Sequence, residues 1–91
     1  MTVLQTSFYP LPIKVLFFAQ SRLAAGCTEC VLKSDRLLTQ AEFWTMLCNA
    51  YPNLVLHQKS ARLARREIYL EDGELLYSGD EIAVIPPVSG G

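Results

Sequence analysis

The clearest candidates for chemistry are the two glycines that end the sequence, Gly90 and Gly91. Glycine lacks a Cβ atom, so two consecutive glycines form the thinnest peptide available, one that fits a narrow channel in another protein. The preceding diproline stiffens the base of this segment, which favours a presented arm over an ordinary frayed terminus. We therefore expect the carboxylate of Gly91 to be the reactive group. The segment expected to enter a partner consists of Pro86, Pro87, Val88, Ser89 and Gly90.

The cysteines and the single histidine are weaker candidates. Cys27 and Cys30 have C-x-x-C spacing, but a zinc site needs about four ligands, and no second pair stands at a suitable spacing. A redox motif would begin a helix after a strand, whereas this one opens an expected strand. Nothing around His57 has the order of a catalytic triad, so we expect a histidine on the surface or in a loop. We predict no metal site, and we expect Cys48 in the core.

Charge gives little indication of a polyanionic partner. The formal net charge is −1, which predicts binding neither to nucleic acid nor to an anionic membrane. Arg62, Arg65 and Arg66 form a basic group that would suit an acidic partner or an anionic substrate. Such a group is more often a solvated face, and we favour that interpretation.

Size and composition indicate one small globular domain, because half of the 91 residues are hydrophobic. The longest apolar run, from Val15 to Ala19, is too short to span a bilayer. The first residues lack the basic and apolar regions of a secretory signal. Three cysteines are an odd number, which argues against a disulfide framework and favours reduced thiols. We therefore expect a cytosolic protein.

Short apolar runs indicate the strands that must position the tail. Residues 13–19 and 82–85 are almost entirely apolar, which is typical of central strands. Two further strands are expected at 29–33, in a hairpin with the first, and at 67–70. Residues 58–66 give no clear signal and are expected to form a loop or one helical turn.

Helix signals are strongest between Thr39 and Pro52. Thr39 and Glu42 have the spacing of a capping box, and Leu38 and Phe43 stand at the two positions of a hydrophobic staple. Pro52 is expected to end the helix. An apolar stripe at helical spacing consists of Trp44, Leu47, Cys48 and Tyr51.

The order strand, strand, helix, strand, strand predicts an α+β fold, a β-grasp or ubiquitin-like roll. We expect the first and last strands to pair in the middle of a mixed sheet, with one main helix packed across one face. The chain then divides into a flexible leader at 1–12, with a short added strand as the alternative there, a β-grasp domain at 13–87 and a flexible Gly-Gly tail at 88–91.

Two segments carry a resemblance to a known family. They are Ile-Lys-Val-Leu-Phe-Phe-Ala-Gln at 13–20 and Gly-Asp-Glu-Ile-Ala-Val-Ile-Pro-Pro-Val-Ser-Gly-Gly at 79–91. Both closely resemble the small subunits of molybdopterin synthase, the sulfur carriers of molybdenum-cofactor biosynthesis. The chain departs from that family in its longer leader, and in Arg65-Arg66-Glu67, where the family commonly has an Asn-containing turn.

The resemblance implies that Gly91 acts through partner proteins. An E1-like activating enzyme would consume ATP to adenylate Gly91, and sulfur would then replace the adenylate to give a C-terminal thiocarboxylate. The tail would enter the synthase large subunit and donate sulfur to a cyclic pyranopterin monophosphate, forming the molybdopterin dithiolene in two rounds. The family also implies an assembly of two small and two large subunits, with no cofactor bound permanently by the small one.

Docking on two partners requires an exposed apolar patch. In the first strand, alternation places Phe17 on the helix side of the sheet and Phe18 on the other side. Ile85 is expected beside Phe18 on the last strand, and Tyr69 can join them from the strand at 67–70. We nominate Phe18, Tyr69 and Ile85 as the partner interface, the alternative being that some of them are ordinary core residues.

Three other functions share this kind of ending. A ubiquitin-like modifier would be activated in the same way, but would be joined through Gly91 to lysines of target proteins. A sulfur carrier for thiamin synthesis or tRNA thiolation would deliver sulfur to a different acceptor. A pure interaction domain would have an inert tail. The Pro-Pro-Val-Ser-Gly-Gly ending and Phe-Phe-Ala-Gln in the first strand favour the synthase subunit.

Overall fold

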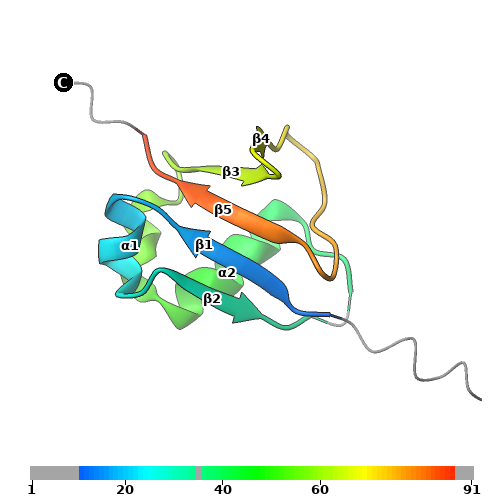
Figure 1. The fold of residues 1–91 in the computed structure, drawn as a ribbon, viewed down its shortest axis with the longest axis horizontal. Helices are drawn as coiled ribbons and strands as arrows, with labels where there is room; N and C mark the ends of the chain where they lie inside the picture. Colours follow the sequence, from blue (N-terminus) through cyan, green and yellow to red (C-terminus); the bar gives the residue numbers. More distant parts are fainter. Residues whose placement is uncertain (1–10, 35, 88–91) are drawn as a thin grey trace, which may run out of the picture.

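A mixed sheet of five strands organises the computed structural model, which describes residues 11–34 and 36–87 (Figure 1). The strand order is β2-β1-β5-β3-β4. The central pair, β1 and β5, is parallel, and the other neighbours are antiparallel. The strands are β1 (Ile13–Phe17), β2 (Glu29–Leu32), β3 (Arg62–Arg65), β4 (Ile68–Tyr69) and β5 (Glu81–Ile85).

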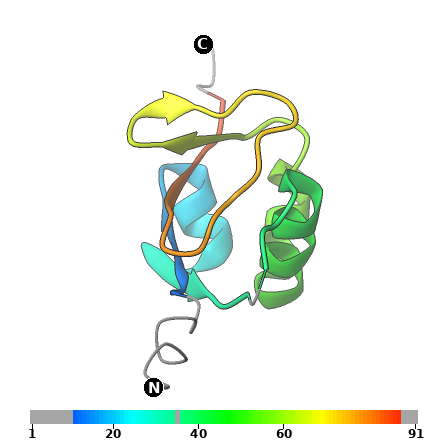
Figure 2. The ribbon, with the colours of Figure 1, turned by 90° about the vertical axis from the view of Figure 1, so that its right-hand side faces the viewer.

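The helix α2 (Gln40–Ala50) lies across one face of this sheet, as the two views in Figures 1 and 2 show. A shorter helix, α1 (Gln20–Ala25), follows β1, and a 3-10 helix, η2 (Pro52–His57), follows α2 and contacts both helices. None of the helices in the described residues is long and apolar enough to cross a membrane. The strand order and the position of α2 confirm the predicted α+β roll, in which the first and last strands are central.

The core lies between α2 and the sheet. Ile13, Val15 and Phe17 of β1 point toward the helix and are at most 1% exposed, as expected from strand alternation. From α2, Phe43 and Leu47 meet them and are fully buried. Burial of this kind supplies most of the driving force for folding in a domain of this size.

The predicted capping of α2 is present. The backbone N–H of Glu42 donates to Thr39 Oγ1 at 3.0 Å, and the backbone N–H of Thr39 donates to Glu42 Oε1 at 2.9 Å. Arg36 Nη1 donates to the other carboxylate oxygen of Glu42 at 2.9 Å. The two residues at the staple positions, Leu38 and Phe43, are both buried. These local bonds fix where the helix begins and thereby which of its faces meets the sheet.

The predicted antiparallel pairing of β1 with β2 is confirmed, but the strands are not joined by a plain hairpin turn, because α1 lies between them. No side chain caps this helix, and the residue before it, Ala19, has a φ of 52°. Its sequence therefore carries no start signal. Tertiary contacts hold it instead: Ser21 is fully buried, and its Oγ lies 3.4 Å from Nδ1 of His57 on η2.

The structure also corrects the region after η2. Residues 62–65 form the strand β3 rather than a loop or helical turn, and the predicted strand at 67–70 is reduced to β4. Pairing with β5 explains β3, since Leu63 lies opposite Val84 and is buried beneath the sheet. Most of the predicted leader and all of the predicted tail at 88–91 lie outside the described residues.

Candidate functional site

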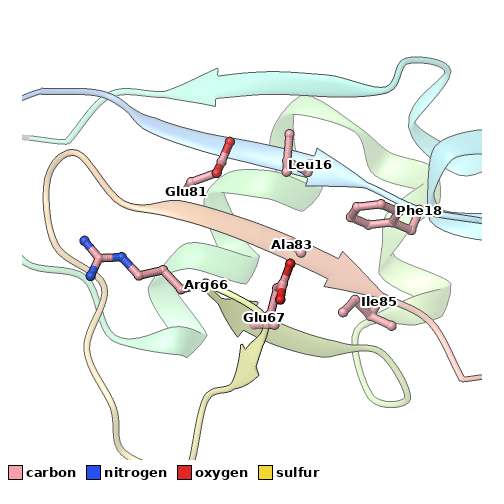
Figure 3. Close-up of a pocket in the computed structure, with 8 residues that line it drawn as sticks. Leu16, Phe18, Arg66, Glu67, Glu81, Ala83 and Ile85 are labelled. Carbon is pink, nitrogen blue, oxygen red and sulfur yellow. The ribbon is translucent and has the colours of Figure 1, made fainter.

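The face of the sheet that α2 leaves uncovered, here called the open face, carries a hollow of about 460 Å³ (Figure 3). Most of its lining comes from β1, β5 and the residues directly beyond their ends, so the hollow lies over the strand pair that leads to the tail. The lining consists of Leu16, Phe18, Ala64, Arg66, Glu67, Glu81, Ala83 and Ile85.

Strand register explains why the open face is hollowed at this point. The parallel pairing of β1 with β5 sets Leu16 opposite Ala83, and the antiparallel pairing of β5 with β3 sets Ala83 opposite Ala64. Residues paired across strands share a face of the sheet. Two small alanines therefore lie side by side in the row that begins at Leu16, next to the larger side chains of Phe18 and Ile85, and leave a depression with an apolar floor.

Two of the three predicted interface residues line this hollow together. The side chains of Phe18, which is 43% exposed, and Ile85, which is half-buried, lie at the same end of it (Figure 3). Tyr69 lies on the same face, because it pairs with Ala64, but it stands outside the lining. Its ring packs against Arg62, whose guanidinium carbon is 3.9 Å from the ring centroid, a cation–π contact.

Charged side chains border the other end of the hollow. Lys14 Nζ lies 3.8 Å from a carboxylate oxygen of Glu29 and 3.8 Å from one of Glu81. These exposed ion pairs contribute little to stability, but they show that Lys14 lies beside Glu81. Glu67 forms no ion pair with any of the residues that the structure describes.

The root of the predicted tail is fixed at the same end of the sheet as Phe18. Pro86 is buried and Pro87 is exposed. Both prolines line a second hollow, of about 230 Å³, together with Gln20, His57 and Ser60. The diproline thus gives the chain a defined exit from β5. His57 lies beside this exit, which the sequence did not indicate, because no motif surrounds this histidine. The other tail residues, Val88, Ser89, Gly90 and Gly91, lie outside the described residues.

Arg65 does not belong to a solvated face, so that interpretation of the arginine group is wrong for this residue. Its Nη2 donates to Asp80 Oδ2 and to the carbonyl oxygen of Leu75, both at 2.8 Å, and its Nε donates to Asp80 Oδ1 at 3.2 Å. Nη1 lies 3.3 Å from Glu74 Oε1. The hydrogen bonds with Asp80, chiefly, raise the pKa of Arg65. Arg65 therefore ties β3 to the turn before β5 and is structural.

The two thiols of the C-x-x-C segment lie half-buried against the core. Burial raises the pKa of the Cys30 thiol. A hydrogen bond with Cys27, and then burial, raise the pKa of Tyr51 to about 12. Cys30 is thus protonated at neutral pH, which disfavours thiolate chemistry. Within the described ranges, no three His, Cys, Asp or Glu side chains are grouped so that they would hold a metal ion.

Comparison with known sequences gives a consistent set of relatives. The ThiS family matches residues 15–91 of this chain. A molybdopterin synthase sulfur carrier subunit from Anopheles gambiae is 39% identical over 84 residues, covering 87% of this chain and 91% of that protein. A protein of the same name from Homo sapiens is 33% identical over 82 residues, covering 87% of this chain and 93% of that protein.

Solved structures give the same fold. SAMP1 from Haloferax volcanii has a TM-score of 0.73 at 26% identity, covering 88% of this chain and 99% of that chain. The small archaeal modifier protein 1 from Methanosarcina acetivorans has a TM-score of 0.70 at 31% identity, covering 90% and 98%. A putative molybdopterin converting factor subunit 1 from Pyrococcus furiosus, at 21% identity with a TM-score of 0.73, covers 86% and 99% and supports the fold.

Proposed function

This chain belongs to the ThiS family, and on that premise we propose that it is the sulfur carrier subunit of a molybdopterin synthase. The observation that carries the proposal is the identity of 33–39% with sulfur carrier subunits over most of both chains. The family match extends to Gly91, so the predicted reactive residue lies within the matched segment. The proposed working partner is the synthase large subunit, in the cytosol.

Gly91 is the reacting residue in this proposal. Its α-carboxylate has an ordinary pKa of roughly 3.5, so it is ionised at neutral pH and is a poor electrophile. An E1-like enzyme converts it to an acyl-adenylate: a carboxylate oxygen attacks the α-phosphorus of ATP, and pyrophosphate leaves. Sulfur at the oxidation level of sulfide then attacks the carbonyl carbon as HS− and AMP leaves with a proton released, so that a thiocarboxylate remains. The subunit binds no permanent cofactor, and ATP is consumed by the activating enzyme.

The domain contributes position rather than catalytic groups. The buried Pro86 and exposed Pro87 fix where the chain leaves β5, while Phe18 and Ile85 form an apolar docking surface on the same pair of strands. A partner that binds the open face therefore meets the tail in a defined direction. Tyr69 belongs to this interface at its edge, beside Arg62. Pro86 to Gly90 serve as the segment that enters the partner, and Gly90 and Gly91 keep it narrow.

Intact-mass measurement tests the chemistry directly. The protein is produced together with its activating enzyme, purified under non-oxidising conditions and weighed, and its C-terminal peptide is then sequenced by fragmentation. We expect a species in which one oxygen is exchanged for sulfur, located on Gly91. Absence of this species after activation by a functional enzyme would refute a sulfur-carrier role.

Deletion of Gly91 separates the tail from the domain. We expect the truncated chain to melt within about 1 °C of the full chain, because a surface terminus contributes little to stability. It should still bind the large subunit but form no molybdopterin. A second variant carries an extra alanine after Gly91, which keeps both glycines but moves the carboxylate. It should also form no molybdopterin. Product formation by either variant, without trimming, would contradict the mechanism.

A second function is favoured by the structural relatives, two of which are named as archaeal modifier proteins at 26% and 31% identity. In that function Gly91 is joined to a lysine amine of a target protein instead of delivering sulfur. Denaturing gels of cells that express a tagged chain distinguish the two. Covalent ladders that require Gly91 indicate the modifier, whereas a thiocarboxylate without ladders indicates the sulfur carrier.

A further inference from the structure

The turn between β3 and β4 holds an unfavourable backbone conformation. Arg65 pairs with Ile68, so Arg66 and Glu67 alone form the loop of this hairpin. Both have positive φ angles, 53° for Arg66 and 68° for Glu67. A two-residue loop of this geometry is usually built from Asn and Gly, because a Cβ atom is disfavoured in the left-handed region. The chain therefore maintains a strained turn at the rim of the hollow with two charged residues.

The strained turn directs its two side chains differently. Glu67 points over Ala83, so that its carboxylate lies at the hollow, whereas Arg66 extends away from Phe18 and Ile85 (Figure 3). Glu67 has no ion-pair partner among the described residues, while Glu81 at the far end shares Lys14 with Glu29. The hollow thus combines an apolar floor with one carboxylate, that of Glu67, which forms no ion pair with a cation among the described residues.

An apolar floor bordered by a carboxylate complements one kind of side chain. Lysine and arginine have an apolar stem and a cationic head, and they bury the stem along apolar surface while the head meets water or an anion. A purely apolar side chain would instead force Glu67 to lose water without compensation. The site is open on one side of the molecule, which suits a side chain presented by a protein surface.

We propose that Glu67 selects the large subunit by binding a lysine or arginine of that subunit, whose stem lies in the hollow over Leu16 and Ala83. This inference rests on the proposed function, because it names the chemistry of the partner at the same open face. Phe18 and Ile85 supply apolar contact next to the tail root, and Glu67 supplies the charge that fixes the register of docking.

The experiment compares Glu67→Gln with Arg66→Gln in binding to the large subunit from the same organism. Both variants keep a residue with a Cβ in the same turn, so the backbone strain is matched, and only one removes the carboxylate. Isothermal titration at low and high salt measures the dissociation constant. We expect E67Q to weaken binding about tenfold and to reduce its salt dependence, as for an interfacial charge pair. R66Q should not weaken binding, because it keeps the carboxylate and removes a neighbouring positive charge that would repel the partner's cation.

A third variant, Phe18→Ala, separates failure of this proposal from failure of the proposed function. If F18A weakens binding but E67Q binds like the unmodified chain, docking on the open face stands and recognition of a cation by Glu67 is refuted. Equal weakening by R66Q and E67Q also refutes it, since the turn rather than the carboxylate would then matter. If neither F18A nor E67Q weakens binding, the docking face itself is wrong. A dimer of this chain that E67Q dissociates would assign the hollow to a second copy and overturn the proposal.

Discussion

The two faces of one sheet have different surroundings in this molecule, and adjacent residues show the contrast. Phe17 and Phe18 are consecutive phenylalanines, yet Phe17 is 1% exposed under α2 and Phe18 is 43% exposed on the open face. The inner face packs against α2 in the hydrophobic core, whereas the open face keeps a hollow. Alternation along a strand is thus enough to separate residues that stabilise the fold from residues available to a partner.

The two faces meet in the central strand pair, which also leads to the base of the predicted tail. The parallel pair of β1 and β5 contributes inner residues to the core and outer residues to the hollow, and the chain continues from β5 into Pro86. The central strand pair therefore carries both the proposed docking surface and Pro86, the base of the proposed reactive arm. A site built on strands is positioned more precisely than one built on a loop, which is what the proposed function requires of that base.

The largest effect is expected from Phe17→Ala, on the inner face. This residue is buried and its ring makes an edge-to-face contact with Tyr51, with centroids 5.6 Å apart. Removing a buried phenylalanine ring leaves a cavity and lowers the free energy of unfolding by about 3–5 kcal/mol. Urea denaturation of the isolated subunit measures this loss. A change below about 1 kcal/mol would show that the inner face does not carry the stability assigned to it.

Phe18→Ala, one residue further, should show the reverse pattern. We expect a change in stability within about 1 kcal/mol, because the side chain is already partly exposed. Binding to the large subunit should weaken by about 2 kcal/mol, roughly 30-fold, as for an aromatic residue at the centre of an interface. Titration calorimetry with the large subunit checks this. Strong destabilisation together with unchanged binding would remove the distinction between the two faces.

Arg62 and Arg65, both on β3, allow a second comparison between a structural residue and a residue on the open face. Arg65 is bound to Asp80 and to the carbonyl oxygen of Leu75, whereas Arg62 lies on the open face over Tyr69. Because Arg65→Met leaves the poorly exposed carboxylate of Asp80 with the backbone N–H of Tyr77 but without its cationic partner, we expect a loss of about 1.5 kcal/mol in unfolding free energy. Arg62→Met should stay within about 0.5 kcal/mol. Parallel thermal melts compare the two variants, and equal losses would contradict the structural role of Arg65.

Elements with strong local signals could be predicted from the sequence. The apolar runs of β1 and β5 and the capping box of α2 each specify their element within a few residues, so the roll and its central strand pair follow. The elements α1 and β3 could not be predicted, because their local signals are weak. A buried Ser21 and a cross-strand partner for Leu63 stabilise them, and both are tertiary effects.

The site shows the same division. Alternation alone predicts that Phe18 and Ile85 share the open face, and the structure brings them together in one hollow. The charged rim was missed, because the turn at Arg66 and Glu67 contains neither glycine nor asparagine and therefore carries no hairpin signal. Arg65 was assigned to a solvated face since its partners, Asp80 and Leu75, follow ten or more residues later in the chain.

The smallest effect is expected at Glu42, which caps the helix that covers the inner face. The backbone N–H of Thr39, and next the guanidinium of Arg36, hold the pKa of this carboxyl below its usual range. A carboxyl with a lowered pKa in the folded chain stabilises the fold above its unfolded pKa, about 4.3 for glutamate. That contribution is lost as the pH falls through the folded pKa.

Glu42→Gln keeps a residue able to complete the capping box but removes the titration. The stability of the unmodified chain should therefore fall more steeply than that of the variant below about pH 4. Urea midpoints measured from neutral to acidic pH test this, and parallel curves would show that the Glu42 carboxylate makes no pH-dependent contribution. Binding to the large subunit at neutral pH should be unchanged, because Glu42 lies on the helix side of the sheet. Weakened binding would mean that the covering helix and the open face are energetically coupled, so that the two faces are not independent.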